Sequence, residues 1–112
     1  MNMGVSVSNG TDCPVELPDA LASMQCAVTR TTLHDHVGPY LAKERFTVQE
    51  ALDSYTIRGA EGSFEETIKG RIAPGMLADF VVLGENPFEV QETSIKDIPV
   101  CQTFTGGKKV FG

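Results

Sequence analysis

The chain has 112 residues, which is enough for one small domain but too few for a second domain or for a barrel of about 250 residues. Nine basic and fifteen acidic residues give a net charge of −6, and the basic residues form no stripe, so we expect no nucleic acid and no membrane as a partner. No apolar run approaches the roughly 18 residues that a membrane span needs. Three widely spaced cysteines without a C-x-x-C pair predict reduced thiols in a cytoplasmic protein: Cys13, Cys26 and Cys101.

The beginning of the chain predicts one short strand. Val5 and Val7 alternate with other residues over 3–8, which is the period of a strand, and the Asn-Gly pair at 9–10 ends it as a turn. A lone strand needs neighbours for its backbone groups. It therefore either pairs with strands near the end of the chain or has its partners outside this chain.

Two or three helices are expected next. Residues 19–30 carry apolar side chains at helical spacing, and Pro18 is suited to the first turn of that helix. Residues 31–45 mix His, Asp, Gly and Pro and predict a loop. The apolar positions of the predicted helix are Leu21, Met24, Ala27 and Val28.

A second helix is marked by a capping box. The Thr47 hydroxyl can accept from the backbone amide of Glu50, while the Glu50 side chain reaches back. Thr56 and Gly59 predict a break, followed by a short further helix that runs towards Phe64.

The end of the chain predicts strands and tight turns. The Pro-Gly pair at 74–75 suits the central positions of a type II turn, and the continuous apolar run at 80–83 predicts a buried strand. Residues 98–104 predict another strand. The Gly-Gly pair at 106–107 then predicts a hairpin that leads into 108–111.

Two segments resemble the metal-dependent amidohydrolase superfamily. Residues 69–83, KGRIAPGMLADFVVL, look like its C-terminal signature, in which Pro-Gly and Ala-Asp precede an apolar strand. Residues 10–16, GTDCPVE, look like the Gly-Ser-Asp segment that closes the eighth barrel strand. Residues 46–60 match the helices between the two. The details at 12–16 and 63–66 are most similar to the YtcJ-type branch, which is related to N-acyl-D-amino-acid deacylases.

The resemblance implies an α/β fragment. Residues 1–68 would be the last strand and helices of a (β/α)8 barrel, and residues 69–112 part of a small C-terminal β-sandwich. In that superfamily the barrel carries one or two divalent ions, usually zinc. We therefore expect the C-terminal portion of an enzyme that hydrolyses a small-molecule amide, N-acyl or cyclic amide bond.

Asp12 is the one candidate catalytic and metal-binding residue. It matches the family aspartate that ligates a metal and shuttles a proton, and a carboxylate at the C-terminal end of a barrel strand lies on the active face. Taken without the family match, Asp12 is an ordinary turn aspartate after Asn-Gly. Because a catalytic zinc usually needs three protein ligands, we expect neither bound metal nor turnover from these 112 residues by themselves.

Other reactive residues are weaker candidates for a catalytic or metal-binding role. Asp79 matches a structural position before a strand, where aspartate commonly hydrogen-bonds backbone. His34 and His36 have the family's His-x-His spacing, but they come after Asp12 in a polar loop, so we expect them to be solvent-exposed. Cys13 lacks the partners of a thiol nucleophile, and a packed, reduced side chain is expected.

The rival hypothesis is a non-catalytic structural or binding module derived from the amidohydrolase C-terminus. In that case the N-terminal strand would pair with the C-terminal strands or across a dimer. Exposed apolar helix faces make a homo-oligomer the expectation under both hypotheses. A third arrangement, in which His34 and His36 bind a metal together with Asp12, is the least favoured.

Overall fold

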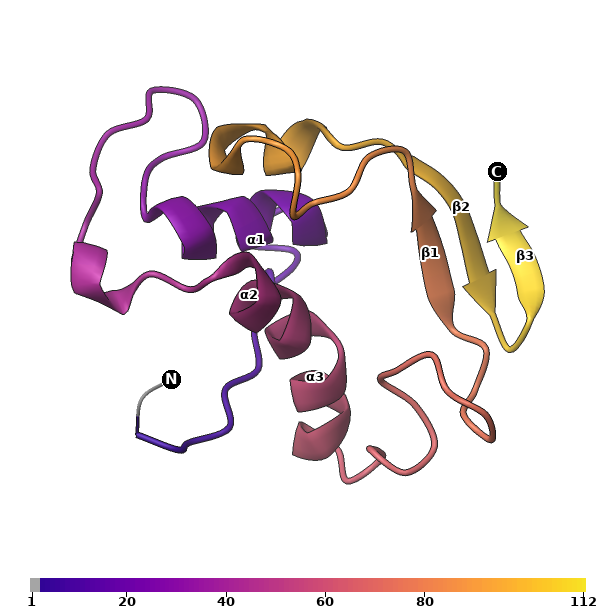
Figure 1. The fold of residues 1–112 in the computed structure, drawn as a ribbon. Helices are drawn as coiled ribbons and strands as arrows, with labels where there is room; N and C mark the ends of the chain where they lie inside the picture. Colours follow the sequence, from indigo (N-terminus) through magenta and orange to yellow (C-terminus); the bar gives the residue numbers. More distant parts are fainter. Residues whose placement is uncertain (1–2) are drawn as a thin grey trace.

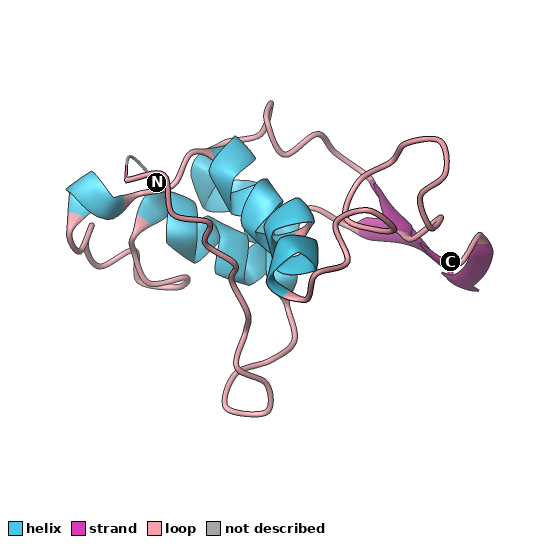
Figure 2. Ribbon diagram, turned by 90° about the horizontal axis from the view of Figure 1, so that it is seen from below, coloured by secondary structure: helices cyan, strands magenta, loops and turns pink. Residues whose placement is uncertain are grey.

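The computed structural model describes residues 3–112, which form helices on one side and a small sheet on the other (Figures 1 and 2). The elements in chain order are α1 (Ala20–Thr29), η1 (Ala42–Glu44), α2 (Val48–Tyr55), α3 (Ile57–Gly62), β1 (Phe80–Leu83), η2 (Glu92–Asp97), β2 (Val100–Thr105) and β3 (Lys108–Phe111). The letter η marks a 3-10 helix. No helix in the described range is long and apolar enough to cross a membrane.

The predicted helix over 19–30 is confirmed as α1, although its start is set by a different residue. The Asp19 carboxylate accepts a hydrogen bond from the amide of Ala22 at 3.0 Å, which makes Asp19 the N-cap. Pro18 precedes the cap and lies outside the first turn. Met24 and Val28, one turn apart, are buried on the face of α1 that packs against η2.

The capping box and the helix break are also confirmed. The Thr47 hydroxyl accepts from the Glu50 amide at 3.1 Å, and the Glu50 carboxylate accepts from the Thr47 amide at 2.9 Å. The second helix, α2, ends at Tyr55, where Thr56 leaves the helical region with φ −118° and ψ −97°. The third helix, α3, then begins at Ile57.

The core joins α1, α2 and η2. Its buried apolar residues are Met24, Val28, Ala51, Ile95 and Ile98. A hydrogen bond also links α1 to η2, because the Oε1 of the fully buried Gln25 accepts from the backbone amide of Lys96 at 2.9 Å. Residues from both 1–68 and 69–112 therefore share one core, and the division of the chain at 68 stays a prediction.

The sheet is antiparallel in the order β1-β2-β3. Phe80 pairs with Phe104, and their rings stack with centroids 4.6 Å apart. Residues 106–107 form the predicted two-residue hairpin turn, with φ of 56° and 78°, as a type I′ turn requires. The type II turn at 74–75 is confirmed as well, since Gly75 has φ 86° and the Met76 amide donates to the Ala73 carbonyl at 3.1 Å.

The predicted N-terminal strand does not form among the described residues. Residues 4–8 have no regular secondary structure, and the sheet β1-β2-β3 takes no strand from them. This segment instead lies beside the helices, where Ser6 Oγ donates to the Glu61 carboxylate at 2.8 Å. Alternating β-branched residues supply the side-chain pattern of a strand, but the ladder also needs a partner backbone. The alternative in which the strand joins the C-terminal strands is thereby excluded.

The prediction of a buried strand at 80–83 is half right. These residues form β1, yet Val81 is 52% exposed and Val82 is 40% exposed. A continuous apolar strand is typical of a sheet covered on both faces. Within residues 3–112, other residues cover the side chains of β1 only in part. The predicted strand over 98–104 also starts later, at Val100, because Ile98 belongs to the core after η2.

Candidate functional site

Asp12 lies in a tight turn between the N-terminal segment and α1. Its backbone is left-handed, with φ 57°, and its carbonyl accepts from the amide of Val15 at 2.9 Å. The Cys13–Pro14 peptide is cis, so the proline occupies the third position of a type VI turn. The Asp12 carboxylate is exposed, and no residue in the described part of the chain bonds to it. It is therefore free to receive a ligand.

The turn is anchored on both sides. Upstream, Asn9 donates two hydrogen bonds to Ser54 of α2, one from its backbone amide and one from its side chain. Downstream, Asp19 caps α1. The free carboxylate is thus carried on a short loop whose two ends are fixed to helices.

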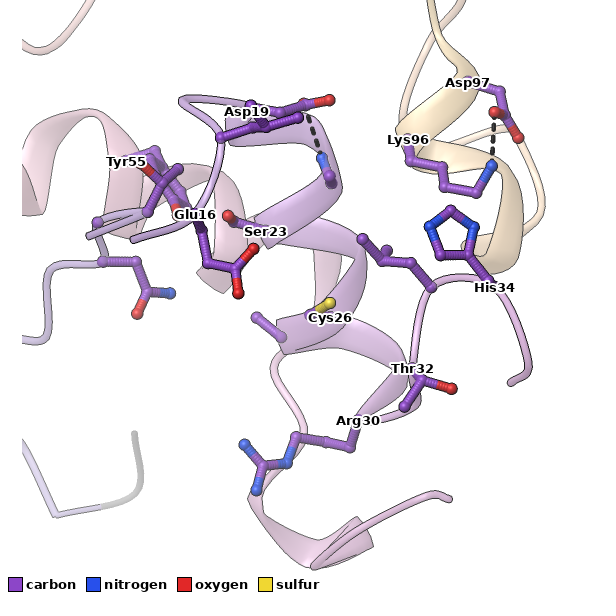
Figure 3. Close-up of a pocket in the computed structure, with 17 residues that line it drawn as sticks. Glu16, Asp19, Ser23, Cys26, Arg30, Thr32, His34, Tyr55, Lys96 and Asp97 are labelled. Carbon is purple, nitrogen blue, oxygen red and sulfur yellow. Dashed lines mark hydrogen bonds and ion pairs between the residues drawn. The ribbon is translucent and has the colours of Figure 1, made fainter. Parts of the chain in front are cut away.

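A groove of about 940 Å³ runs along α1 next to this loop (Figure 3). The groove takes its walls from the loop, from α1 itself, from the segment after α1 and from η2. In Figure 3, Glu16 lies on one side of α1, and His34 lies with Lys96 on the other. Thr11 lines the groove, whereas the next residue, Asp12, does not.

The thiol in this groove is not set up as a nucleophile. Burial, with a smaller contribution from the Glu16 carboxylate, raises the pKa of the Cys26 thiol. A raised pKa keeps the thiol protonated at neutral pH, and the thiolate is the nucleophilic form. The groove therefore offers carboxylate, imidazole and ammonium groups rather than a reactive sulfur.

Apart from His34, the other reactive residues lie outside this groove. His34 and His36 are exposed, as predicted. Asp79 is structural, as predicted, because its Oδ1 accepts from the Gly106 amide in the β2–β3 turn at 2.7 Å. The expectation of a packed Cys13 is wrong, since its side chain is exposed at the tip of the type VI turn. A residue in the middle of a tight surface turn has little protein around it.

The family model that matches the chain is described as the amidohydrolase family, and it covers residues 1–111. This chain belongs to the amidohydrolase family. The resemblance to the amidohydrolase superfamily is thereby confirmed.

Three curated relatives of this amidohydrolase chain match nearly all of it. The Bacillus subtilis protein YtcJ, assigned as an amidohydrolase, is 33% identical over 99% of the chain and 21% of its own length. The protein LONG AFTER FAR-RED 3 of Arabidopsis thaliana is 31% identical over 99% of the chain and 19% of its own length. The N-substituted formamide deformylase of Arthrobacter pascens is 30% identical over 96% of the chain and 19% of its own length. The chain thus spans about a fifth of the length of these relatives.

A solved structure shares the fold. The amidohydrolase from Thermotoga maritima superposes with a TM-score of 0.72 at 22% identity, over 98% of this chain and 24% of that one. The helices and the small antiparallel sheet are therefore an α/β portion of the amidohydrolase fold.

The described residues contain no complete metal site. Among residues 3–112, no group of three or more His, Cys, Asp or Glu side chains is placed to hold a metal ion. The free carboxylate of Asp12 suits one ligand position, and a catalytic zinc takes about three protein ligands. These residues alone do not fit a whole zinc site, so any further ligands would have to come from elsewhere.

Sequence reasoning missed the Asn9–Ser54 contact. The Asn-Gly pair at 9–10 predicts a turn and gives no sign of a distant partner for Asn9. The one available signal is the spacing of Ala51 and Ser54, two small residues three apart on one face of α2, both fully buried. Small side chains at that spacing let another segment approach the helix closely.

Proposed function

We propose that these residues are the C-terminal portion of a metal-dependent amidohydrolase that hydrolyses a non-peptide carbon–nitrogen bond in a small molecule. The substrate would carry an amide, N-acyl or cyclic amide group. The names of YtcJ and of the formamide deformylase support this class of reaction. The observation that carries the proposal is the exposed, unbonded Asp12 carboxylate in a chain of this family.

Asp12 acts in this proposal as a proton carrier. Its carboxylate takes a proton from the attacking water and returns it to the departing nitrogen. A divalent metal, zinc in our proposal, would lower the pKa of the water that attacks. Because no cation or amide within residues 3–112 bonds to the two carboxylate oxygens of Asp12, both remain available for these contacts.

The position of the chain in the whole enzyme is part of the same proposal. Residues 1–68 would close a (β/α)8 barrel, and residues 69–112 would contribute to a small β-sandwich. Residues 3–8 would then be a barrel strand whose neighbours lie outside this chain. The exposed valines of β1 support this placement, since a second layer of sheet would cover them.

The test is an amide-hydrolysis assay of the complete translation product of the gene that encodes these residues. With a divalent metal supplied, it should hydrolyse at least one of the three amide classes. Asp12→Asn should lower kcat about 100-fold or more, because proton transfer by a placed side chain contributes that much. Asp35→Asn is the matched control, since Asp35 is another exposed loop carboxylate. Full activity of the Asp12→Asn variant would contradict the proposal.

The second candidate function, a self-associating module without catalysis, is favoured by one observation. A groove of about 720 Å³ between α2–α3 and β1 is lined largely by apolar side chains, including Leu52, Ile72, Val81 and Phe88. Such a surface favours contact with a second copy of the chain. A complete translation product that forms oligomers but neither binds metal nor hydrolyses amides would favour this function.

The three free cysteines support, for both functions, a location in the cytoplasm.

A further inference from the structure

Asn9 makes two hydrogen bonds to one buried residue far along the chain. Its backbone amide donates to the Ser54 carbonyl at 3.1 Å, and its Nδ2 donates to Ser54 Oγ at 3.1 Å. Ser54 is fully buried, and its hydroxyl proton is already committed to the Ala51 carbonyl at 2.7 Å. The hydroxyl lone pairs are therefore directed to an outside donor, and Asn9 Nδ2 is that donor.

The break between α2 and α3 makes the Ser54 carbonyl available. In an uninterrupted helix this oxygen would accept from the amide of Arg58, four residues on. Instead, the Thr56 amide turns back to the Asp53 carbonyl at 3.2 Å, and α3 restarts with the Ala60 amide on the Thr56 carbonyl at 3.1 Å. The last carbonyls of a helix need partners from outside the helix. Asn9 supplies one of them.

This contact lies directly upstream of the candidate catalytic residue. Asp12 comes three residues after Asn9, in a turn closed by its own carbonyl and the Val15 amide. The next fixed point is Asp19, the N-cap of α1. The loop that carries the free carboxylate is therefore held between α2 on one side and α1 on the other.

We propose that Asn9 and Ser54 form a positioning pair that sets where the Asp12 carboxylate stands. The inference deepens the proposed function and rests on it for the meaning of Asp12. The contact between Ser6 and Glu61 holds the same segment three residues earlier, but it is exposed to solvent and is the weaker restraint. The buried partner makes Asn9 the residue that determines the start of the loop.

The pair is tested in the 112-residue chain by NMR, without any substrate. Asn9→Ala and Ser54→Ala should each speed amide hydrogen exchange at positions 9 and 15 several-fold, because the amide at 9 donates to the Ser54 carbonyl and the amide at 15 closes the Asp12 turn. The double variant should add little, because both changes remove the same contact. Exchange in α1 should stay as in the unchanged protein, which separates local loosening from general unfolding. Ser8→Ala is the matched control, since among the described residues Ser8 has no hydrogen-bond partner.

Unchanged exchange at positions 9 and 15 in the Asn9→Ala variant, or additive effects in the double variant, would overturn the positioning pair. A second measurement uses the complete translation product. There, Asn9→Ala should lower kcat per folded enzyme about 10-fold and leave KM unchanged, with the folded fraction measured by circular dichroism so that misplacement of Asp12 is separated from loss of folded enzyme. An unchanged kcat per folded enzyme would count against the pair. Full activity of Asp12→Asn would instead remove the proposed function, while the exchange data still decide the pair.

Discussion

Two aspartates show how differently one side chain can be used in this chain. Asp79 stands before β1 and accepts from the Gly106 amide, so it joins the start of one strand to the turn between the other two. Asp12 has no such contact within residues 3–112. The structural role of Asp79 could be predicted from its place before an apolar run. The freedom of Asp12 could not, because it depends on what the rest of the fold leaves uncovered.

Removing the Asp79 acceptor should loosen the hairpin. Asp79→Ala is expected to lower the free energy of unfolding by about 1 kcal/mol, the usual net value of one hydrogen bond. Urea unfolding measures this, and Asp35→Ala, which removes an exposed loop carboxylate, should change stability by less. Equal stability of the two variants would contradict the structural role.

The stability of the folded chain should depend on the ionisation of Glu50, and hence on pH. Its hydrogen bond from the Thr47 backbone amide lowers the pKa of the Glu50 carboxyl below its ordinary value. The folded chain therefore holds fewer protons than the unfolded chain as the pH falls below about 4.5, so the stabilisation by ionised Glu50 is lost on acidification. Glu50→Gln should flatten the fall in unfolding midpoint between neutral and acidic pH. An identical pH profile in the variant would contradict this linkage.

At the scale of elements, the local signals were reliable. The capping box at Thr47, the type II turn at 74–75 and the hairpin turn at 106–107 each depend on a few neighbouring residues, and each formed as predicted. Elements that need distant partners were not predictable. Residues 3–8 lack a partner backbone, and η2 has neither a strand nor an α-helical pattern in its sequence.

Two glycines should respond with opposite signs to the same substitution. Gly75→Ala should destabilise the chain by about 1 kcal/mol, because φ is 86° there and a side chain disfavours that conformation. Gly59→Ala should stabilise it by about 0.5–1 kcal/mol, because Gly59 lies within α3 with open space around its Cα. Thermal unfolding of both variants gives the comparison. Shifts of the same sign would contradict the assigned turn or the assigned helix.

At the scale of the whole molecule, the chain leaves apolar surface uncovered. Met24, Val28 and Ile95 fill a small core, whereas Val81 of β1 and Phe88 line an open groove beside α2–α3. The sequence could indicate this, because the motif at 69–83 is that of a longer family. Which face stays open could not be predicted, since it depends on how η2 packs onto α1.

This surface should drive self-association. Sedimentation velocity over a range of concentrations is expected to show dimers or larger species of the 112-residue chain. Val81→Lys, which places a charge in the groove of β1, should shift the distribution towards monomer. Val110→Lys is the matched control, an equally exposed valine on β3 outside that groove, and should shift it less. A monomer at every concentration would contradict the prediction.

Our central proposal is that Asp12 is one ligand of a metal site completed by residues beyond this chain. Elemental analysis of purified protein by mass spectrometry tests it most directly. We predict negligible zinc on the 112-residue chain, about one zinc or more on the complete translation product, and a clear loss from that product in Asp12→Asn. Stoichiometric zinc on the 112-residue chain would contradict the proposal. So would a complete product whose zinc content is unchanged by Asp12→Asn.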